Sequence, residues 1–220
     1  MGINQNDVNY WDLGEIRLRA AQKSDAEVLY GHAASSPARI ERAYDSIGFP
    51  QSRRDVKRRL TDNIAETAEA RGDDMRLFII EETTGDADGA SDVRDNSYLN
   101  CAAKFVGYVD VWEADAHNGV FCTGIKMIAG KDGKGYATKA FARVLGFYFD
   151  ELRYQKCDVY IYDFNEASHK FHKKFGFIEE GRRRREYYSG GAYHDAVLYG
   201  LTAEDFRISW QAYQNAHISP

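Results

Sequence analysis

Three glycines and two lysines stand within six residues, at 130–135, between a strand-like and a helix-like segment. Residues 120–128 are apolar and of strand length, and apolar residues recur at three- and four-residue steps from 137 to 152. A glycine turn between a strand and a helix leaves the first N–H groups of the helix unpaired at the positive end of its dipole. The pattern predicts a seat for a phosphate group, which glycine allows to approach the backbone. A glycine turn without a ligand is the alternative.

Two common phosphate loops are excluded by the spacing of this turn. The mononucleotide loop G-x-x-x-x-G-K-[ST] requires lysine where Tyr136 stands. The dinucleotide fingerprint G-x-G-x-x-G requires its third glycine where Thr138 stands. Neither type of nucleotide loop is therefore predicted.

A second group of polar residues follows a short apolar segment at 158–162. Asn165 suits the N-cap of a helix, and Ser168 falls in the first turn, where its hydroxyl could reach a ligand or its own backbone. Ser168, Phe171 and His172 share one face because they are three and four residues apart. Another side of this helix is cationic, either as a solvated face or as part of a site, and carries Lys170, Lys173 and Lys174.

The motifs belong to an ordered series of predicted elements. Strands are predicted at residues 16–20, 76–82, 101–112, 120–128, 158–162, 177–188 and 193–201, and helices are predicted to begin near residues 24, 52, 137 and 165. The stretch after residue 83, rich in Asp and Gly, predicts an exposed loop at 83–100. We expect an N-terminal lead-in at 1–14, a single domain at 15–205 and a C-terminal tail at 206–220.

Composition indicates a folded globular protein of 220 residues with 44% hydrophobic content. Its formal net charge of −5 gives no sign of nucleic-acid binding and favours a cationic small molecule or basic peptide as partner. The spacing of the three cysteines, Cys101, Cys122 and Cys157, is not that of a metal site, so no bound metal is expected. We expect them to be buried free thiols in a protein of the reducing cytoplasm. No apolar run approaches the ~20 residues that cross a bilayer, so no membrane association is expected.

Together, the two motifs resemble those of the GNAT superfamily of N-acetyltransferases, within the branch that modifies ribosomal proteins and polyamines. The family loop [RQ]-x-x-G-x-[GA] corresponds to residues 132–137, and the helix motif N-x-x-[SA]-x-x-x-Y-x-K-x-G-F to residues 165–177. Residues 180–182 and 190–195 resemble the closing hairpin of that branch. The resemblance implies an α/β (α+β) acyl-CoA N-acyltransferase fold, with a mixed, mostly antiparallel central sheet of about seven strands flanked by about four helices.

The resemblance also implies a reaction. An acetyl group would pass from acetyl-CoA, the co-substrate, to a primary amine by direct attack in a ternary complex, without a metal. The acceptor would be a small polyamine, an aminosugar or a protein N-terminus, and a homodimer is possible within the family. Two alternatives are transfer of a longer acyl group and a module that binds acyl-CoA without turnover.

Site residues follow from the resemblance position by position. The backbone N–H groups of residues 134–138 would hold the pyrophosphate of coenzyme A, and the strand edge around Met127 and Ile128 would pair with the pantetheine arm. A backbone N–H near Met127 would face the thioester oxygen. The cofactor-binding candidates are Met127, Ile128, Lys131, Asp132, Gly133, Lys134, Gly135, Tyr136, Ala137, Thr138, Asn165, Ser168, Phe171 and Lys174.

Two positions depart from the family pattern. Asp132 stands where the family has Arg or Gln, which places a carboxylate beside the expected pyrophosphate. His172 stands where many members have the Tyr that protonates the departing thiolate. Histidine can donate a proton near neutral pH, so His172 is the candidate acid, and simple packing of its ring is the alternative.

The acceptor amine must lose a proton before it attacks, because an alkylamine is protonated at neutral pH. Residues 120–126 contain no acid that could take this proton. Asp110 on the neighbouring strand is the candidate base, with Glu113 and Asp163 as substitutes. Residues 35–50 and 189–194 are expected to frame the acceptor, and the arginines at 182–185 to form a solvated strand edge.

Overall fold

The computed structural model describes residues 9–22, 24–25, 28–29, 54, 58, 62, 76–83, 104–128 and 133–217. The strands are β1 (Ile16–Ala20), β2 (Arg76–Glu82), β3 (Phe105–Asp115), β4 (Val120–Met127), β5 (Lys156–Tyr162), β6 (Ile178–Ser189) and β7 (Ala192–Thr202). The helices with bounds in these residues are α5 (Tyr136–Gly146), the π-helical η1 (Phe147–Glu151), α6 (Glu166–Lys174) and α7 (Ala203–His217).

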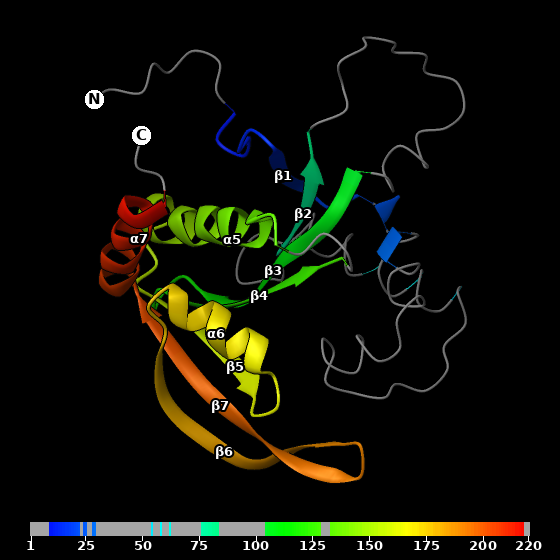
Figure 1. The fold of residues 1–220 in the computed structure, drawn as a ribbon, viewed down its shortest axis with the longest axis vertical. Helices are drawn as coiled ribbons and strands as arrows, with labels where there is room; N and C mark the ends of the chain where they lie inside the picture. The colour runs from blue at the N-terminus through cyan, green and yellow to red at the C-terminus, as the bar shows by residue number, and fades with distance from the viewer. Residues whose placement is uncertain are drawn as a thin grey trace.

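The strands form one seven-stranded sheet in the order β1-β2-β3-β4-β5-β7-β6. All neighbouring strands are antiparallel except β4 and β5, which are parallel (Figure 1). The predicted fold class, a mixed and mostly antiparallel sheet of about seven strands, is confirmed. The prediction of about four flanking helices is slightly off, since three α-helices have bounds in the described residues and one of them, α7, was not predicted.

Alternation along the strands separates two apolar faces of the sheet. On one face, α5, α6 and α7 cover the central strands, and the shared core includes Phe141, Phe175 and Phe206. On the other face, Val28 and Leu29 pack with Ile79 and Phe105. Both residues are helical and buried, which agrees with a helix that begins near residue 24. Because side chains alternate, residues between those of the first core point toward the second face.

The predicted strand at 76–82 agrees with β2, and the two predicted hairpins agree with β3–β4 and β6–β7 within a few residues. The β6–β7 turn has φ of +58° at Gly190 and +86° at Gly191, a combination that favours glycine at both positions of a tight hairpin. Other predictions concern residues outside the described ones: the lead-in at 1–8, the acceptor frame at 35–50, the apolar stripe of the second helix, Cys101, and most of the loop at 83–100.

The C-terminal segment is a helix rather than the expected tail. Phe206 of α7 is 3% exposed and lies 5.5 Å, ring to ring, from Phe149 of η1. Trp210 stacks on Phe175, the C-cap residue of α6, at 6.0 Å. The apolar face of α7 therefore completes the core on the α5 side of the sheet.

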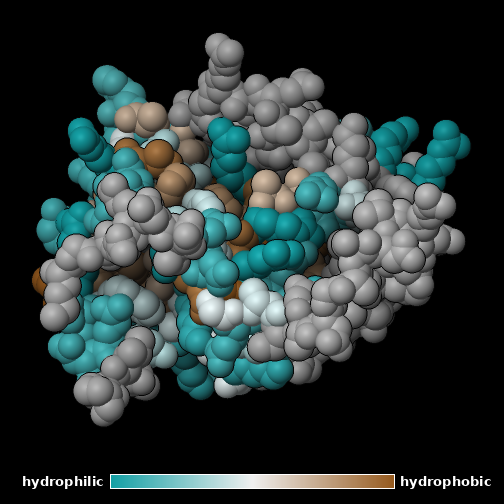
Figure 2. All heavy atoms as spheres, turned by 90° about the horizontal axis from the view of Figure 1, so that it is seen from above, coloured by the Kyte–Doolittle hydropathy of each residue, from teal (hydrophilic) through white to brown (hydrophobic). Residues whose placement is uncertain are grey.

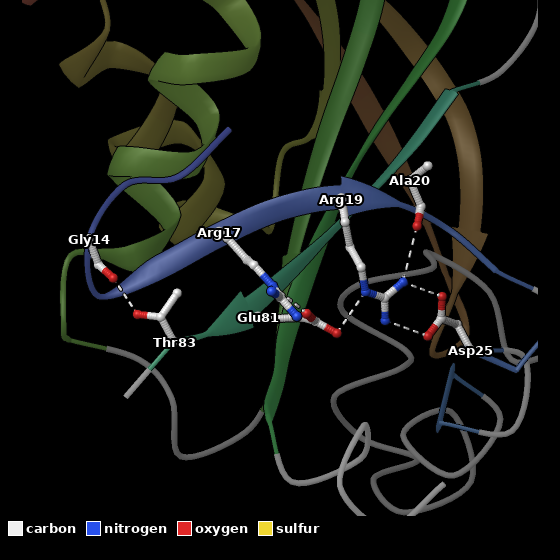
Figure 3. A network of polar contacts seen from close by, with 7 residues as sticks. All are labelled: Gly14, Arg17, Arg19, Ala20, Asp25, Glu81 and Thr83. Carbon is white, nitrogen blue, oxygen red and sulfur yellow. Dashed lines mark hydrogen bonds and ion pairs between the residues drawn. The ribbon is translucent and has the colours of Figure 1, made fainter. Parts of the chain in front are cut away.

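A buried ionic network joins the start of the first helix to the sheet (Figure 3). Arg19 on β1 bonds Asp25 through both terminal nitrogens at 2.7 Å and Glu81 on β2 at 2.7 Å. Arg17 bonds the other oxygen of Glu81 at 2.9 Å, and Asp25 also accepts the backbone N–H of Gln22. Because the carboxylates of Asp25 and Glu81 are almost fully buried, these bonds supply the partners that buried charges need.

Seen from above, the surface is mixed, with hydrophobic residues recessed between hydrophilic ones (Figure 2). None of the helices in the described ranges is both long enough and apolar enough to cross a bilayer. Cys122 and Cys157 are free and buried, as expected, and burial raises the pKa of the Cys122 thiol to about 12.

Candidate functional site

The glycine turn before α5 is open above its backbone. Gly133 and Gly135 have φ of +86° and +76°, and a Cβ added at either would meet no atom of the described residues within 4 Å. Gly135 is the N-cap of α5, and no side chain of the described residues caps this helix end. The N–H groups of Tyr136, Ala137 and Thr138 therefore lack intrahelical partners at the positive end of the helix dipole. Lys131 and Asp132 lie outside the described residues.

A second positive charge lies at the same helix end. Lys174, the last residue of α6, donates from Nζ to Thr138 Oγ1 at 2.6 Å. Its ammonium lies over the rings of Phe171, Phe175 and Tyr213 at 5.2, 5.7 and 5.4 Å. Partial burial lowers the pKa of Lys174, and no carboxylate of the described residues pairs with it. An ammonium and a helix N-terminus together favour an anion between them.

Two other described lysines near the turn, Lys134 and Lys139, are already paired. Lys134 Nζ lies 2.9 Å from Glu82 Oε1, and this hydrogen bond raises the pKa of Lys134. Lys139 Nζ lies 2.6 Å from Glu15 Oε2. These two side chains are tied to strand β2 and to the segment before β1, so among the described residues the backbone of the turn and Lys174 remain to receive an anion.

The parallel strands β4 and β5 separate after three residue pairs. Val120, Phe121 and Cys122 pair with Lys156, Cys157 and Asp158, and no further pair joins these two strands within their described lengths. The edge of β4 from Thr123 to Met127 therefore has no strand beside it on the β5 side. An edge of this kind presents unpaired N–H and C=O groups to an extended ligand.

The pairing of β4 with β3 decides which N–H groups face this gap. Ile128 donates its backbone N–H to Val106 O at 2.9 Å, toward β3. Because successive N–H groups of a strand point in opposite directions, Met127 directs its N–H toward the gap. Of the two predicted strand residues, Met127 therefore faces the open edge, and the N–H of Ile128 is already bonded to β3.

Asn165 caps α6, as the sequence predicted. Its side chain accepts the backbone N–H of Ser168 at 3.2 Å. Ser168 in turn approaches His172: Ser168 Oγ is 3.2 Å and Ser168 O is 2.9 Å from His172 Nδ1. The first turn of α6 thus forms one connected polar chain at the same end of the sheet as the open edge of β4.

The environment of His172 does not support the predicted role as proton donor. The residue is 5% exposed, and its ring makes edge contacts with Phe141, Phe171 and Phe177 at 5.1–5.4 Å. Burial lowers the pKa of His172 to about 4, so the imidazole is neutral at neutral pH. A proton on Nδ1, facing the carbonyl of Ser168, leaves Nε2 as a buried acceptor with no partner among the described residues. Packing, the alternative left open by the sequence, describes His172 better.

Asp110 lies on the sheet face opposite α5. Val109 and Val111 on either side belong to the core under α5, so Asp110 points the other way. A Cβ added at Gly124, its partner on β4, would lie 2.8 Å from Asp110 Oδ1. Oδ1 is buried without a hydrogen-bond partner in the described residues. Burial raises the pKa of this carboxyl, and the nearby positive charge of Lys126 lowers it by a smaller amount. The carboxylate therefore covers β4 beyond the last β4–β5 pair.

A histidine and a carboxylate meet at the far end of β5. Asp163 directly follows β5, and its Oδ1 lies 3.2 Å from Nδ1 of His194 on β7. Asp163 Oδ2 accepts the backbone N–H of Asp195 at 3.1 Å, which fixes the carboxylate. The ring of Phe164 contacts the imidazole edge-on at 4.6 Å. Sequence reasoning named Asp163 and the 189–194 turn separately, but it did not pair them.

Sequence reasoning also missed α7. Tyr213 contributes one of the rings under Lys174, and α7 and α5 line a hollow of about 530 Å³ that begins at Gly135 and Thr138. The signal was available, because Phe206, Trp210 and Tyr213 recur at helical steps of four and three residues. In the described parts of the chain, no three His, Cys, Asp or Glu side chains gather as metal ligands would.

Comparison with known proteins agrees with the family resemblance of the sequence motifs. A family profile described as "Acetyltransferase (GNAT) domain" matches residues 15–178. The chain is 29% identical over 202 residues to the SPbeta prophage-derived uncharacterized N-acetyltransferase YokL of Bacillus subtilis (strain 168), covering 92% of this chain and 98% of YokL.

Solved structures share the fold. Spermidine N-acetyltransferase from Vibrio cholerae, in complex with CoA and spermine, superposes with a TM-score of 0.67 at 18% identity over 88% of this chain and 98% of that one. RimL, a ribosomal L7/L12 alpha-N-protein acetyltransferase, superposes with a TM-score of 0.67 at 17% identity over 86% of this chain and 91% of RimL.

Proposed function

The chain belongs to the GNAT acetyltransferase family, and we propose that it transfers the acetyl group of acetyl-CoA to a primary amine by direct attack in a ternary complex. Membership of the family makes the protein an acyltransferase. The proposal concerns the donor, the acceptor and the residues that act on them.

One observation carries the proposal: the strand that leads into α5, β4, separates from β5, and no side chain of the described residues caps the N-terminus of α5. The gap offers the backbone edge from Thr123 to Met127, and the turn at Gly133 and Gly135 offers the N–H groups of α5. A ligand that fits both features has an anionic end and an extended arm with amide groups. Coenzyme A is such a molecule, with its pyrophosphate and its pantetheine.

The residues that would hold the donor fit its chemistry. The N–H groups of residues 134–138 and the ammonium of Lys174 would bind the pyrophosphate. Because no carboxylate of the described residues pairs with Lys174, the pyrophosphate would supply its counter-charge. The β4 edge would bond the amides of the arm, with Asn165, Ser168 and Phe171 at the neighbouring helix. Acetyl-CoA supplies a thioester that is already activated, and the protein then needs only to orient it.

Met127 would assist the chemical step through its backbone. Its N–H points into the gap, toward the place where the thioester oxygen would gain negative charge as the amine attacks. A fixed donor at such a position commonly contributes about 10²–10³-fold to the rate. The amine nitrogen forms its bond to the carbonyl carbon, the C–S bond breaks, the thiolate leaves, and the nitrogen gives its surplus proton to water to form the amide.

The acceptor arrives as an ammonium that must lose a proton before it attacks, and two carboxylates beside the gap would attract this cation. Asp110 covers the gap from β3, and Asp163 lies at the end of β5. His172 is not part of this proposal as an acid, because its imidazole is buried and neutral. The thiol of coenzyme A has a pKa of ~8.5, like other thiols, so the departing thiolate can take its proton from water.

The acceptor is proposed at the level of a primary amine. The two structural neighbours are a spermidine N-acetyltransferase and a ribosomal L7/L12 alpha-N-protein acetyltransferase, and both kinds of acceptor present an amine. Carboxylates on the face opposite α5 would attract a cationic amine, consistent with the net charge of −5. A polyamine, an aminosugar and a peptide N-terminus all meet this description.

The test is a panel of amines incubated with acetyl-CoA, with release of free thiol as the readout. We expect thiol release that depends on the amine, and its loss in Gly135→Glu, where a carboxylate would occupy the anion seat. Gly14→Glu is the matched control, because Gly14 also has a positive φ (+80°) and a Cβ added there would meet none of the described atoms within 4 Å. Coenzyme A binding without thiol release from any amine would contradict the proposal. A parallel series with longer acyl-CoA donors reports the preferred acyl group.

A further inference from the structure

The His194–Asp163 pair has the arrangement of an oriented base. Both oxygens of Asp163 are engaged, Oδ1 by the imidazole at 3.2 Å and Oδ2 by the N–H of Asp195 at 3.1 Å. A carboxylate fixed in this way holds the proton of a neutral histidine on Nδ1. The lone pair of Nε2 then points away from Asp163, and Nε2 has no hydrogen-bond partner among the described residues.

The pair lies at the same end of the gap as Met127. Because β4 and β5 run parallel, the ends of both strands meet at one edge of the sheet, and Asp163 directly follows β5. Side chains alternate between the two faces along β7, and Val197 belongs to the core on the α5 side. His194 is three residues from Val197, so its side chain points to the opposite face, the same face as Asp110. Asp110 and His194 therefore stand on one face, on opposite sides of the gap.

The groups around His194 keep its second nitrogen accessible. Its side chain is 25% exposed, so a proton taken up there can pass to water. The arginines of β6 bond Asp195 rather than the imidazole: Arg182 at 3.3 Å from Oδ2 and the backbone of Arg185 at 2.8 Å from Oδ1. The other described side chains of this cluster, from the end of β5 and from β6, are Tyr162, Phe164 and Tyr187.

Asp110 suits a different task. Its Oδ1 is buried and Lys126 already acts on its charge, so a proton on this carboxyl would have no direct path to water. Imidazole is the side chain that takes up and releases protons between pH 5 and 8, where general bases work best. A buried carboxylate is suited to hold an ammonium near the gap.

We propose that His194, positioned by Asp163, takes the proton from the acceptor amine, and that Asp110 draws the ammonium into place. This inference rests on the proposed acetyl transfer. The N–H⁺ bond of the ammonium breaks and its proton moves to His194 Nε2. The freed lone pair forms the C–N bond, which leaves a positive charge and one surplus proton on the nitrogen. The C–S bond of the thioester breaks, the thiolate carries off the electron pair, and the nitrogen gives its surplus proton to water as the neutral amide forms. The imidazolium then returns its proton to water.

The experiment measures kcat and kcat/KM against pH for the wild-type chain, His194→Gln and Asp163→Asn, with the best amine of the panel. We expect His194→Gln to lower kcat at pH 7 by about 100-fold or more, the usual contribution of a general base. Its rate should recover as the pH rises toward ~10, where an alkylamine loses its proton unaided. Asp163→Asn should cause a smaller loss with the same change in the pH profile.

Two further variants separate a base from a merely structural side chain. In His194→Ala, imidazole added to the solution should restore part of the activity, which it could not do for a packing defect. His117→Gln is the matched control, because His117 is exposed in the β3–β4 turn at the opposite end of β4. It should keep the wild-type profile. Coenzyme A affinity, measured by calorimetry, should be unchanged in all of these variants.

An unchanged pH profile in His194→Gln, with the profile lost instead in Asp110→Asn, would overturn the proposal and make Asp110 the base. Loss of coenzyme A binding in His194→Gln would also overturn it, since the residue would then support the fold. A wild-type chain that binds coenzyme A but acetylates no amine would refute the proposed function itself, and that result appears before any variant is made.

Discussion

Replacing Lys174 by methionine tests the anion seat most directly. Lys174 Nζ lies 2.6 Å from Thr138 Oγ1, at the first turn of α5, with no carboxylate partner in the described residues. A hydrogen bond to a charged group contributes about 1.5–3 kcal/mol, so losing the ammonium should weaken coenzyme A binding by about 10- to 100-fold. Calorimetric titration of coenzyme A into the wild-type chain and Lys174→Met measures this difference.

The same substitution should barely change stability without the ligand. Methionine keeps an unbranched apolar side chain against the three rings, which replaces cation–π contacts by sulfur–aromatic ones of similar size. Because partial burial lowers the pKa of Lys174, the unfolded chain binds this proton more tightly. The charged lysine therefore lowers stability at neutral pH, and this cost lasts until the pH rises through the folded-state pKa. The free energy of unfolding should stay within about 1 kcal/mol of wild type.

Lys170→Met is the control on the same helix. Lys170 is 80% exposed and lies 3.7 Å from Glu166, one turn away, so its loss should change neither affinity nor stability appreciably. If Lys174→Met binds coenzyme A like the wild-type chain but unfolds more easily, Lys174 holds the three rings together. The reasoning from unbalanced charge would then be refuted.

Three other substitutions have definite expected results. Gly135→Glu should weaken coenzyme A binding by about 100-fold or more, through loss of the backbone seat and repulsion of the phosphates, while Gly14→Glu should bind normally in the same titration. His172→Phe should make stability less sensitive to acid: with a folded-state pKa of about 4 against 6.5 unfolded, the wild-type histidine costs about 2–3 kcal/mol at pH 4.5 and nothing at pH 8. Thermal unfolding at both pH values measures this, and equal acid sensitivity in the two proteins would contradict it. Phe206→Ala should lower the free energy of unfolding by about 3–5 kcal/mol in denaturant titration, whereas a negligible loss would mean that α7 contributes little to the core.

Local signals in the sequence were sufficient for most of the fold. Strand alternation placed β2 at its observed bounds, and the asparagine before an apolar helical stripe placed the start of α6 correctly. These signals work because caps and alternation depend on neighbours along the chain. Spacing and periodicity also located the glycine turn and the seven strands, the resemblance implied how those strands form one sheet, and the observed sheet confirms the strand count.

Properties set by distant contacts could not be predicted. The acid role suggested for His172 takes no account of Phe141, which lies on another helix and helps to bury the imidazole. The distinction between Met127 and Ile128 depends on the register of β4 against β3, which no local pattern specifies. The importance of Lys174 depends on Thr138, 36 residues earlier in the chain. In each case the chemistry follows from a partner that only tertiary structure brings near.

The short β4–β5 pairing has a mechanical consequence. Strands β1 to β4 form one half of the sheet, β5 to β7 the other, and three residue pairs join them at one end. Two half-sheets joined over so short a length can change their mutual angle while keeping the remaining interstrand bonds intact. An extended molecule lying between them would bond to the free edge of β4 and stiffen the joint, so that occupancy and rigidity of the whole sheet would rise together.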